Sequence, residues 1–434
     1  MGIETATLLI ILVMIGMMML GVPLAWITMS LAVGCTILWL GPAGLPLVAS
    51  RVYGFVNEYI FVAVPLFVLM ACVLERSGVA QDLYEAMRLF AGRLPGGVAV
   101  QTTLVAMVMA AMTGIIGGEI VLLGLIALPQ MLRLGYDRKM AIGIICAGGS
   151  LGTMIPPSVV LIVYGLTAGV SIGDLFLAAI IPGIILGLLY IAYVIIRCVK
   201  NPALAPRAPN SELAIPAAEK LRLLKGLILP VMIIVWVLGS IYGGIASVTE
   251  AAGVGVVGAI VSAAIRGELG WSMMRESVLR TMTTVGVIIW LTLGANAFIG
   301  IYNIMGGTGY LRGAISGLPL PPLGIVLVMM LILLVLGCII DWIGICLLTM
   351  PIFVPVIKEL GYDPVWFGVL FCMNMQVSYL SPPFGPAAFY LKSVAPPGIE
   401  LHTIFRAVLP FIALQLVGLM LVLLFPEISL WLVR

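Results

Sequence analysis

Two Pro-Pro pairs, each flanked by hydroxyl-bearing and small residues, are the places where this chain is best equipped to bind an ion. The first pair lies in residues 148–158 (GGSLGTMIPPS) and the second in residues 374–385 (NMQVSYLSPPFG). Adjacent prolines break a helix and leave carbonyl oxygens without amide partners. Such a break persists in an apolar span only where the freed groups gain partners, and carbonyls with hydroxyls suit a hard cation such as sodium. The amino ends of the half-helices carry partial positive charge and suit an anionic substrate.

Candidate ligands come from both breaks and from two Gly-rich, acid-containing points near residues 113–119 and 337–344. The residues expected to bind sodium are Thr113, Gly114, Gly118, Gly149, Ser150, Gly152, Pro156, Gly337, Asp341, Asn374, Ser378, Ser381, Pro382 and Gly385. The residues expected to contact the substrate are Glu119, Ser158, Gln376 and Phe384.

The acids Glu119 and Asp341 are costly inside a membrane, so we expect them to attract a cation or to hydrogen-bond at a hairpin tip. The alternative is that they cap helix ends that water reaches. Glu250 follows Thr249 at the start of an apolar span, which favours N-terminal capping by Thr249. For a single Pro-Pro pair, a simple kink would be an even alternative, but two pairs at matching positions favour function.

The matching positions belong to a duplicated unit. Residues 134–137 (LGYD) recur as residues 360–363, an offset of 226, and the two Pro-Pro pairs keep the same offset. The chain of 434 residues is 63% hydrophobic and 9% charged, with a mean hydropathy of +1.26. Soluble domains are about a quarter charged, so this composition predicts an all-α polytopic membrane protein in a lipid bilayer. Nothing in it favours nucleic-acid binding.

The apolar pattern predicts two repeats joined by a polar linker. Residues 1–57 are N-terminal scaffold helices, and residues 58–197 form repeat 1, with an arm helix, a re-entrant hairpin at about 97–131 and a broken helix at about 140–166. An amphipathic surface helix is expected around 79–93, with Asp82, Glu85, Arg88 and Arg93 on its wet face. Residues 198–225 are a cytoplasmic linker and 226–280 are scaffold helices. Residues 281–434 form repeat 2, with an arm helix, a hairpin at about 320–357 and a broken helix at about 364–391.

The basic residues predict the orientation, because Lys and Arg favour the cytoplasmic side. Placing residues 76–93, 132–139, 197–225, 266–280 and 392–406 inside leaves only four of the 21 basic residues outside: Arg51, Arg312, Lys358 and Arg434. Both termini then lie outside. The two copies of the LGYD motif fall on opposite sides, so the repeats are expected to have inverted topology.

Several motifs that are typical of enzymes lie in the wrong context. Residues 148–152 match G-x-S-x-G, but that nucleophile motif needs a strand, a turn and a nearby histidine, and His402 is the only one in the chain. Residues 253–258 match G-x-G-x-x-G within an apolar span, which favours helix packing. With one His, seven scattered Cys and no Walker motif, we expect no catalysis, no transition metal and no cofactor besides sodium ions.

The chain resembles the large membrane (M) subunit of the tripartite ATP-independent periplasmic (TRAP) transporters over essentially its whole length. The resemblance rests on residues 64–80 (VPLFVLMACVLERSGVA), 94–99 (LPGGVA), 152–158 (GTMIPPS), 249–254 (TEAAGV), 350–369 (MPIFVPVIKELGYDPVWFGV) and 381–385 (SPPFG). It implies a sodium-driven, elevator-type importer of the ion transporter superfamily in the bacterial inner membrane, with periplasmic termini. It also implies a small four-helix membrane subunit (Q type), a periplasmic substrate-binding protein (P type) and a small organic anion as substrate.

The sequence departs from the family pattern at several of these positions. Thr113-Gly114-Ile115 stands where a Ser-Gly-Ser-type tip is usual, Glu119 stands at the acidic position, and Asp341 replaces the usual Glu. Gln376, Ser378 and Phe384 are more polar or bulkier than usual, which leaves the substrate class open. Two alternatives remain: a stand-alone ion-coupled carrier of the same superfamily, and, far less favoured, a membrane-embedded serine hydrolase using Ser150 or Glu119.

Overall fold

The computed structural model describes residues 2–91, 94–114, 117–206 and 223–434. Within these ranges the regular elements are helices and no strand occurs, so the prediction of an all-α protein is confirmed. Seven of the described helices are long and apolar enough to cross a membrane, for which about 20 apolar residues are needed. The polytopic membrane class follows from these helices and from the composition.

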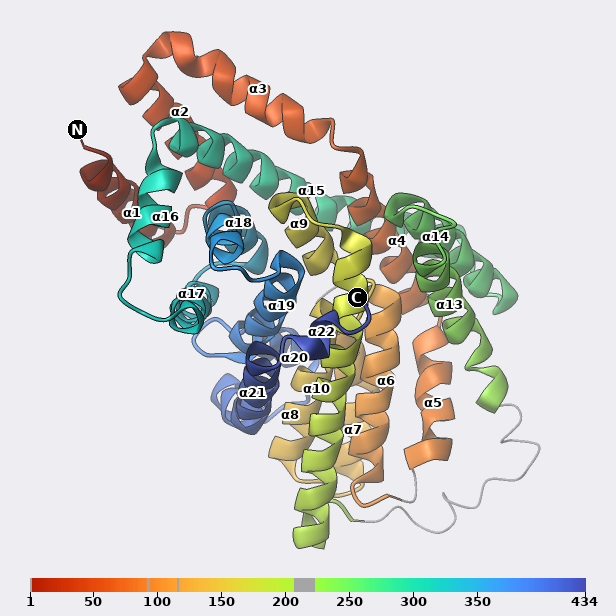
Figure 1. Cartoon of the computed structure of the whole chain (residues 1–434). Coiled ribbons are helices and arrows are strands. Elements are labelled where there is room, and N and C mark those ends of the chain that lie inside the picture. The colour runs from red at the N-terminus through yellow and green to blue at the C-terminus, as the bar shows by residue number, and fades with distance from the viewer. Residues whose placement is uncertain (1, 92–93, 115–116, 207–222) are drawn as a thin grey trace.

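Up to residue 206, the described part of the chain contains ten helices of the α type (Figure 1). Their bounds are α1 Ile3–Met19, α2 Leu24–Leu40, α3 Leu45–Val56, α4 Ala63–Arg76, α5 Val79–Ala91, α6 Gly97–Thr113, α7 Gly118–Arg133, α8 Arg138–Gly149, α9 Val159–Ala168 and α10 Ile172–Lys200. Four short 3-10 turns accompany them: η1 Pro42–Gly44, η2 Tyr59–Val62, η3 Ser150–Thr153 and η4 Pro202–Leu204.

In the second half, the helices from Ile228 onward run to the C-terminus. Their bounds are α13 Ile228–Tyr242, α14 Val248–Ile265, α15 Trp271–Ile304, α16 Gly307–Ser316, α17 Pro322–Gly337, α18 Trp342–Glu359, α19 Pro364–Leu380, α20 Pro386–Val394, α21 Leu401–Leu424 and α22 Glu427–Leu430. Most of the expected linker, residues 207–222, lies outside the described residues, and α10 extends to Lys200, three residues into the range expected for that linker.

Each long apolar segment is broken at its centre, as the glycines predict. The first segment forms α6 and α7 (hairpin 1), and the second forms α17 and α18 (hairpin 2). Each predicted broken helix is also interrupted: α8 and α9 flank residues 150–158 (the first break), and α19 and α20 flank residues 381–385 (the second break). Both Pro-Pro bonds in these breaks are cis.

The repeated LGYD motif starts the same kind of helix in both halves. Asp137 accepts a hydrogen bond from the Met140 amide at 2.9 Å and begins α8; Asp363 accepts one from the Val365 amide at 2.8 Å and begins α19. An aspartate at this position satisfies one of the free amides of the first helical turn. The two helices begin at residues 138 and 364, which are again 226 positions apart.

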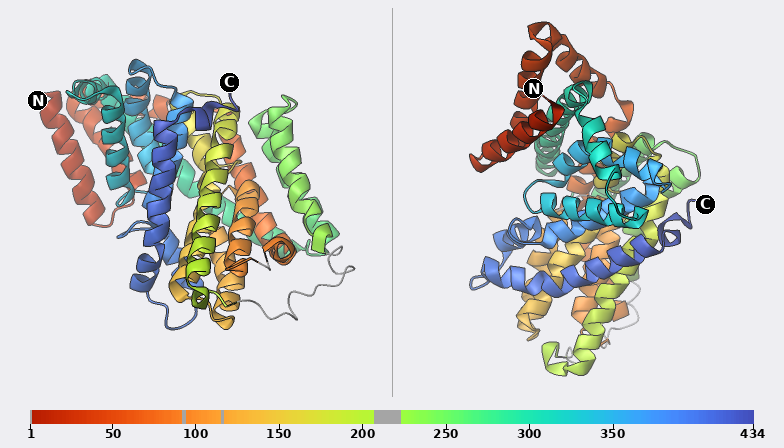
Figure 2. Two further views of the ribbon diagram at one scale, coloured as in Figure 1. Left: turned by 60° about the horizontal axis from the view of Figure 1, so that its bottom comes forward. Right: turned by 60° about the vertical axis from the view of Figure 1, so that its left-hand side comes forward.

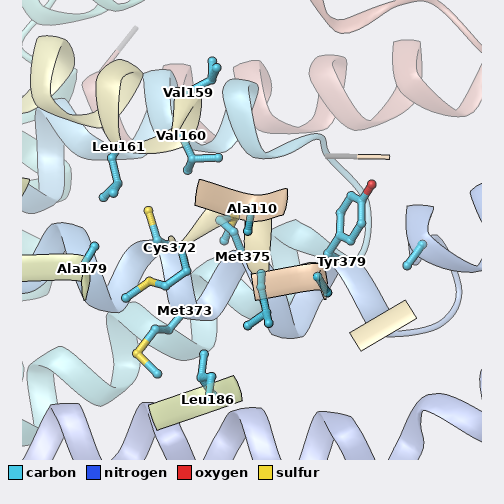
Figure 3. Close-up of a cluster of buried hydrophobic side chains, with 14 of the residues drawn as sticks. Ala110, Val159, Val160, Leu161, Ala179, Leu186, Cys372, Met373, Met375 and Tyr379 are labelled. Carbon is cyan, nitrogen blue, oxygen red and sulfur yellow. The ribbon is translucent and has the colours of Figure 1, made fainter. Parts of the chain in front are cut away.

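The two halves interlock by exchanging partners. Helix α8 packs against α21 and α19 packs against α10, while α7 packs against α20 and α18 against α9. Figure 2 shows α10 and α21 running alongside one another through the centre of the molecule. In the core, Ala110, Val160 and Leu186 of the first half are buried around Met373 and Met375 of α19 (Figure 3). This reciprocal packing brings both breaks and both hairpins into one bundle.

A second group of helices lies along one side of this bundle (Figure 1). The 34-residue helix α15 extends across the molecule and packs against α2, α3 and α4, and α14 packs between α4 and α13 (Figure 1). Helix α15 begins at Trp271, ten residues before the expected start at residue 281, because residues 271–280, which mix polar and apolar side chains, continue the same helix.

The structure tests two local predictions, the cap of α14 and the amphipathic helix at residues 79–93. The cap of α14 is Ser247 rather than Thr249: its hydroxyl accepts from the Glu250 amide, and the Glu250 carboxylate accepts from the Ser247 amide at 2.7 Å. This S-x-x-E capping box was present in the sequence and was missed. The amphipathic helix predicted at 79–93 is α5, whose Asp82 pairs with Arg266. Of the other expected wet-face residues, Arg93 and the Arg88 side chain lie outside the described part.

Candidate functional site

The tip of hairpin 1 is joined to the first break by a backbone hydrogen bond. Helix α6 ends at Thr113, and Gly114 follows with a φ of 60°, in the left-handed region that favours glycine. The carbonyl oxygen of Gly114 accepts a hydrogen bond from the Val159 amide at 3.2 Å. A Cβ on Gly114 would stand 3.0 Å from the Pro157 carbonyl carbon, so only glycine allows this close approach. Residues 115–116 of the expected tip lie outside the described residues.

Glu119 lies on the other side of this tip, on the first turn of α7. Its side chain is fully buried, and the Thr113 hydroxyl donates a hydrogen bond to Oε1. Its second oxygen, Oε2, has no hydrogen-bond partner among the described residues. A Cβ on Gly152 would stand 3.0 Å from Oε1, so the carboxylate faces the η3 turn. Buried carboxylates without partners are costly, so this oxygen is available to a ligand.

The remaining hydroxyls of the first break bond to their own backbone. The Ser158 hydroxyl donates to the Thr153 carbonyl at 2.6 Å, and the Thr153 hydroxyl donates to the Ser150 carbonyl at 2.9 Å. Gly149 lies against the first turn of α7, where a Cβ would stand 3.1 Å from the Ile120 nitrogen. Buried Pro156 and half-buried Ile155 complete the break. Because the Thr153 and Ser158 hydroxyls already donate to backbone carbonyls, the break offers few hydroxyl protons to a substrate.

Hairpin 2 also contacts the broken helix of its own repeat, at α19 before the second break. Gly337, at the end of α17, lies so close to Ser378 that a Cβ would clash with the serine side chain. The Asn374 amide donates to the Met330 carbonyl at 2.6 Å, which ties α19 to α17. Asp341 accepts from the Ile343 amide at 3.2 Å and caps α18. Asp341 lies at the surface of the described chain, whereas Glu119 is buried. Of the two acids, only Asp341 has the position that the helix-cap alternative requires.

The second break itself turns outward. The Ser381 hydroxyl donates to the Val377 carbonyl at 2.7 Å, and the Gly385 amide donates to the Ser381 carbonyl at 2.8 Å. Pro382 is exposed, and 61% of the Phe384 side chain is exposed. The structure therefore does not bring Phe384 together with the other candidates for the substrate.

The two repeats are connected at a buried polar cluster that the sequence reasoning identified only in part. Gln376 donates to the Ser150 carbonyl at 3.1 Å, and Gln415 of α21 donates to the Ser150 hydroxyl at 3.1 Å. The hydroxyl itself donates to the Ala147 carbonyl at 2.7 Å. The carbonyl oxygens of both glutamines and the hydroxyl of buried Tyr190 have no partner among the described residues. A lone glutamine within the apolar segment 404–425 was the signal for Gln415.

The cluster also bears on the hydrolase alternative. The Ser150 hydroxyl donates to the Ala147 carbonyl and accepts from Gln415. No hydrogen bond in the described part of the chain joins it to the single histidine of the sequence. That histidine, His402, is exposed and lies 3.0 Å from the Glu400 carboxylate. Among the described residues, the hydrogen bonds of Ser150 do not include the basic side chain that activates a serine nucleophile.

The structure thus brings the predicted residues together in two places, each made of one hairpin tip and one half-helix. Thr113, Gly114, Gly118, Glu119, Gly149 and Gly152 meet at hairpin 1, and Gly337, Asn374 and Ser378 meet at hairpin 2. Both places contain side-chain oxygens, those of Thr113 and Glu119 in one and those of Asn374 and Ser378 in the other, and oxygen is the ligand atom that hard cations take.

Comparison with known proteins agrees with this architecture. Residues 11–428 match the family described as the DctM component of the tripartite ATP-independent periplasmic transporters. The C4-dicarboxylate TRAP transporter large permease protein DctM of Pseudomonas aeruginosa is 31% identical over 406 residues, which cover 93% of each chain. The isethionate TRAP transporter permease protein DctMQ of Oleidesulfovibrio alaskensis is 30% identical and matches 95% of this chain and 64% of that one.

A solved structure shows the same fold at low sequence identity. The YdaH transporter of Alcanivorax borkumensis, whose crystal structure is described as revealing an unusual topology, aligns with a TM-score of 0.61 and 17% identity. The alignment covers 90% of this chain and 89% of that chain. At this identity the likeness concerns the fold alone.

Proposed function

The chain belongs to the DctM family of TRAP transporters. We propose that it is the large permease subunit and that a sodium gradient drives its uptake of a small organic anion. The sodium part of the proposal rests on the buried Glu119 carboxylate, which faces Gly152 of the first break. Its Oε1 accepts from the Thr113 hydroxyl, and its Oε2 has no partner among the described residues. A sodium ion bound there would neutralise a charge that the interior otherwise leaves uncompensated.

The residues at hairpin 2 provide a second place of the same kind. Gly337, Asn374 and Ser378 lie at the contact between α17 and α19. The backbone carbonyls of the second break, residues 381–385, follow Ser378 closely in the sequence. The matching halves and the matching breaks support two cation sites in repeats of inverted topology. In this proposal Asp341 acts mainly as the cap of α18.

An elevator motion fits the separation of the helices into two groups. The interlocked bundle of hairpins and broken helices would slide against the group formed by α2, α3, α4, α14 and α15. Binding of cation and substrate together would allow the hairpins to close. The chain would work in the bacterial inner membrane, with both termini in the periplasm.

The relatives support the partners and the class of substrate. Their names include C4-dicarboxylate, sialic acid and 2,3-diketo-L-gulonate transporters, all of which handle organic acids, and also ectoine transporters. One relative is named DctMQ, and this name supports a Q-type partner for the large permease. A periplasmic binding protein would deliver the substrate.

The test is the melting temperature of the purified chain, with its small partner, against sodium at constant ionic strength. Binding to the folded state at a hundredfold excess over Kd stabilises it by about 2.7 kcal/mol. We expect a saturable rise with sodium that potassium and choline do not produce. A flat response to sodium would contradict preformed cation sites.

A stand-alone carrier is the second candidate, and the alignment of this chain with 89% of one solved transporter chain favours it. Uptake by this chain alone in proteoliposomes, without a binding protein, would establish that candidate.

A further inference from the structure

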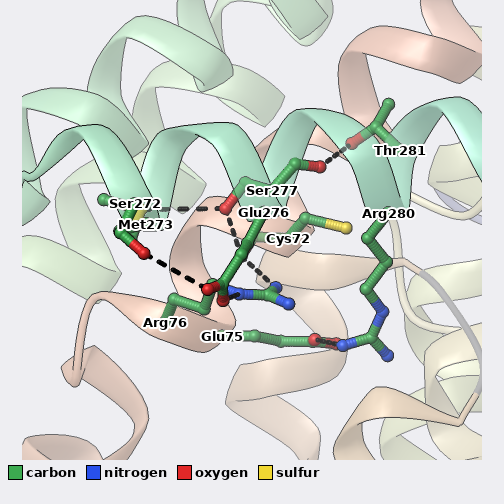
Figure 4. Close-up of polar contacts among 9 residues, drawn as sticks. All are labelled: Cys72, Glu75, Arg76, Ser272, Met273, Glu276, Ser277, Arg280 and Thr281. Carbon is green, nitrogen blue, oxygen red and sulfur yellow. Dashed lines mark hydrogen bonds and ion pairs between the residues drawn. The ribbon is translucent and has the colours of Figure 1, made fainter.

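Two ion pairs join the same two helices, α4 and α15, and only one of them touches a hairpin. Glu75 and Arg280 lie 2.9 Å apart, and Arg76 and Glu276 lie 3.6 Å apart (Figure 4). The Glu75 side chain is 11% exposed, whereas Glu276 is 58% exposed. The second pair is therefore an ordinary surface pair, and the first is enclosed on its acidic side.

The Glu75 carboxylate is enclosed by the tip of hairpin 1. A Cβ built on Gly118 would stand 2.6 Å from the carboxylate carbon of Glu75 and closer still to Oε1. Gly118 is the first residue of α7, and its neighbour Gly117, with a φ of 104°, precedes the helix without a side chain that caps it. The carboxylate of one helix therefore occupies the amino end of another.

This position has the chemistry of a carboxylate receptor. The amino end of the 16-residue helix α7 presents free amides and partial positive charge, and the Arg280 guanidinium approaches the same carboxylate from α15. Arginine pairs well with carboxylates because its planar fork donates two parallel hydrogen bonds. Arg280 is 47% exposed on its side chain, so it keeps donors free for another acceptor.

Two stacked tyrosines, Tyr379 and Tyr390, lie beside Gly117 at the start of α7. A Cβ on Gly117 would stand 2.8 Å from the ring of Tyr390, and Tyr390 stacks on Tyr379 with ring centroids 6.4 Å apart. Tyr379 is 7% exposed, and its hydroxyl has no hydrogen-bond partner among the described residues. In Figure 3 this hydroxyl points away from the apolar cluster. This buried phenol, stacked on the ring that meets Gly117, is a donor without a partner among the described residues.

We propose that Arg280 and the amino end of α7 form an anion site that Glu75 fills in this state and that a carboxylate of the transported anion fills when Glu75 leaves. In this state the Glu75 carboxylate therefore occupies the position that a carboxylate of the substrate would take. Because α4 and α15 lie outside the interlocked bundle, movement of hairpin 1 separates α7 from Glu75 and frees the site. The substrate part of this inference rests on the proposed function, but the existence of the anion site does not.

Chemical rescue tests the site without knowledge of the substrate. Glu75→Ala leaves a carboxylate-sized space beside Arg280, so sodium acetate at millimolar concentration should raise the melting temperature of E75A saturably, relative to sodium chloride at the same ionic strength. The double variant E75A/R280Q should lose this response. The matched control is Glu276→Ala, which frees Arg76 in the parallel pair of the same helices and should show no acetate response.

An acetate response of E75A no larger than that of E276A would overturn the anion site. If E75A does not fold, Arg280→Gln in the otherwise unchanged chain decides the matter: the KM for the transported acid should rise at least tenfold while the sodium-dependent melting shift is retained. Arg275→Gln, an exposed arginine on the same helix, should change neither. An unchanged KM in R280Q would overturn the proposal, whereas absence of uptake by the unmodified protein would count against the proposed function only.

Discussion

Replacing Gly114 by alanine should separate hairpin 1 from the first break. Gly114 has a φ of 60°, and a residue with a side chain pays about 1–2 kcal/mol in this region. The added Cβ would also stand 3.0 Å from the Pro157 carbonyl carbon and closer to its oxygen. These are backbone atoms, so they cannot rotate aside as the end of a flexible side chain does.

Relief of the clash requires α6 to move away from the break, and that movement breaks the 3.2 Å hydrogen bond from the Val159 amide to the Gly114 carbonyl. Leaving a buried backbone group without a partner costs about 1–3 kcal/mol. The two contributions predict a destabilisation of roughly 2–5 kcal/mol. Because Thr113 and Glu119 lie on either side of Gly114, the sodium-dependent stabilisation should weaken as well.

The assay is thermal unfolding of purified G114A with and without saturating sodium, followed by uptake in proteoliposomes. Gly286→Ala is the matched control, because Gly286 lies within α15 and a Cβ there meets nothing within 4 Å. Alanine is favoured over glycine in a helix by about 1 kcal/mol, so G286A should melt at or slightly above the unmodified protein. A G114A protein that melts like G286A and keeps its sodium response would refute the reasoning.

Three further predictions concern contacts at the second repeat and between the repeats. Gly337→Ala should lower the melting temperature through its clash with Ser378, and the added change Ser378→Gly should restore it; a double variant no better than the single one would contradict the contact. Gln376→Leu removes the hydrogen bond to the Ser150 carbonyl and should cost about 1–3 kcal/mol of unfolding free energy, measured by denaturant unfolding; an unchanged midpoint argues against the buried cluster. Asp363→Ala removes the cap of α19 and should cost about 1 kcal/mol in the same assay, whereas no loss would mean that the cap is redundant.

The helices and their breaks were predictable because they depend on local rules. Asp137 and Asp363, the last residues of the LGYD motifs, cap the helices that follow them, α8 and α19. The Pro-Pro pairs interrupt the two predicted broken helices. Gly114 was predictable as a tip residue for the same reason, since a glycine between two apolar runs favours a left-handed helix end. The roles of the repeats in transport remain predictions.

The partners of polar side chains were less predictable, because they depend on which helices meet. Gln415 and Ser150 are 265 residues apart, and Glu75 and Arg280 are 205 apart, so no local pattern joins them. Gln376 was expected to contact substrate, yet it is fully buried and holds the Ser150 carbonyl of the other repeat. Its orientation follows from the packing of α19 against the η3 turn, which only the tertiary structure determines.

Uptake driven by an imposed sodium gradient tests the central claim most directly. The chain would be reconstituted with a Q-type subunit and a binding protein, and labelled C4-dicarboxylates and 2-oxo acids would be offered with sodium or potassium outside. The account predicts that one of these acids accumulates only under an inward sodium gradient and leaves again when an ionophore collapses that gradient. Accumulation that is equal in sodium and in potassium would contradict sodium coupling at the hairpin tips.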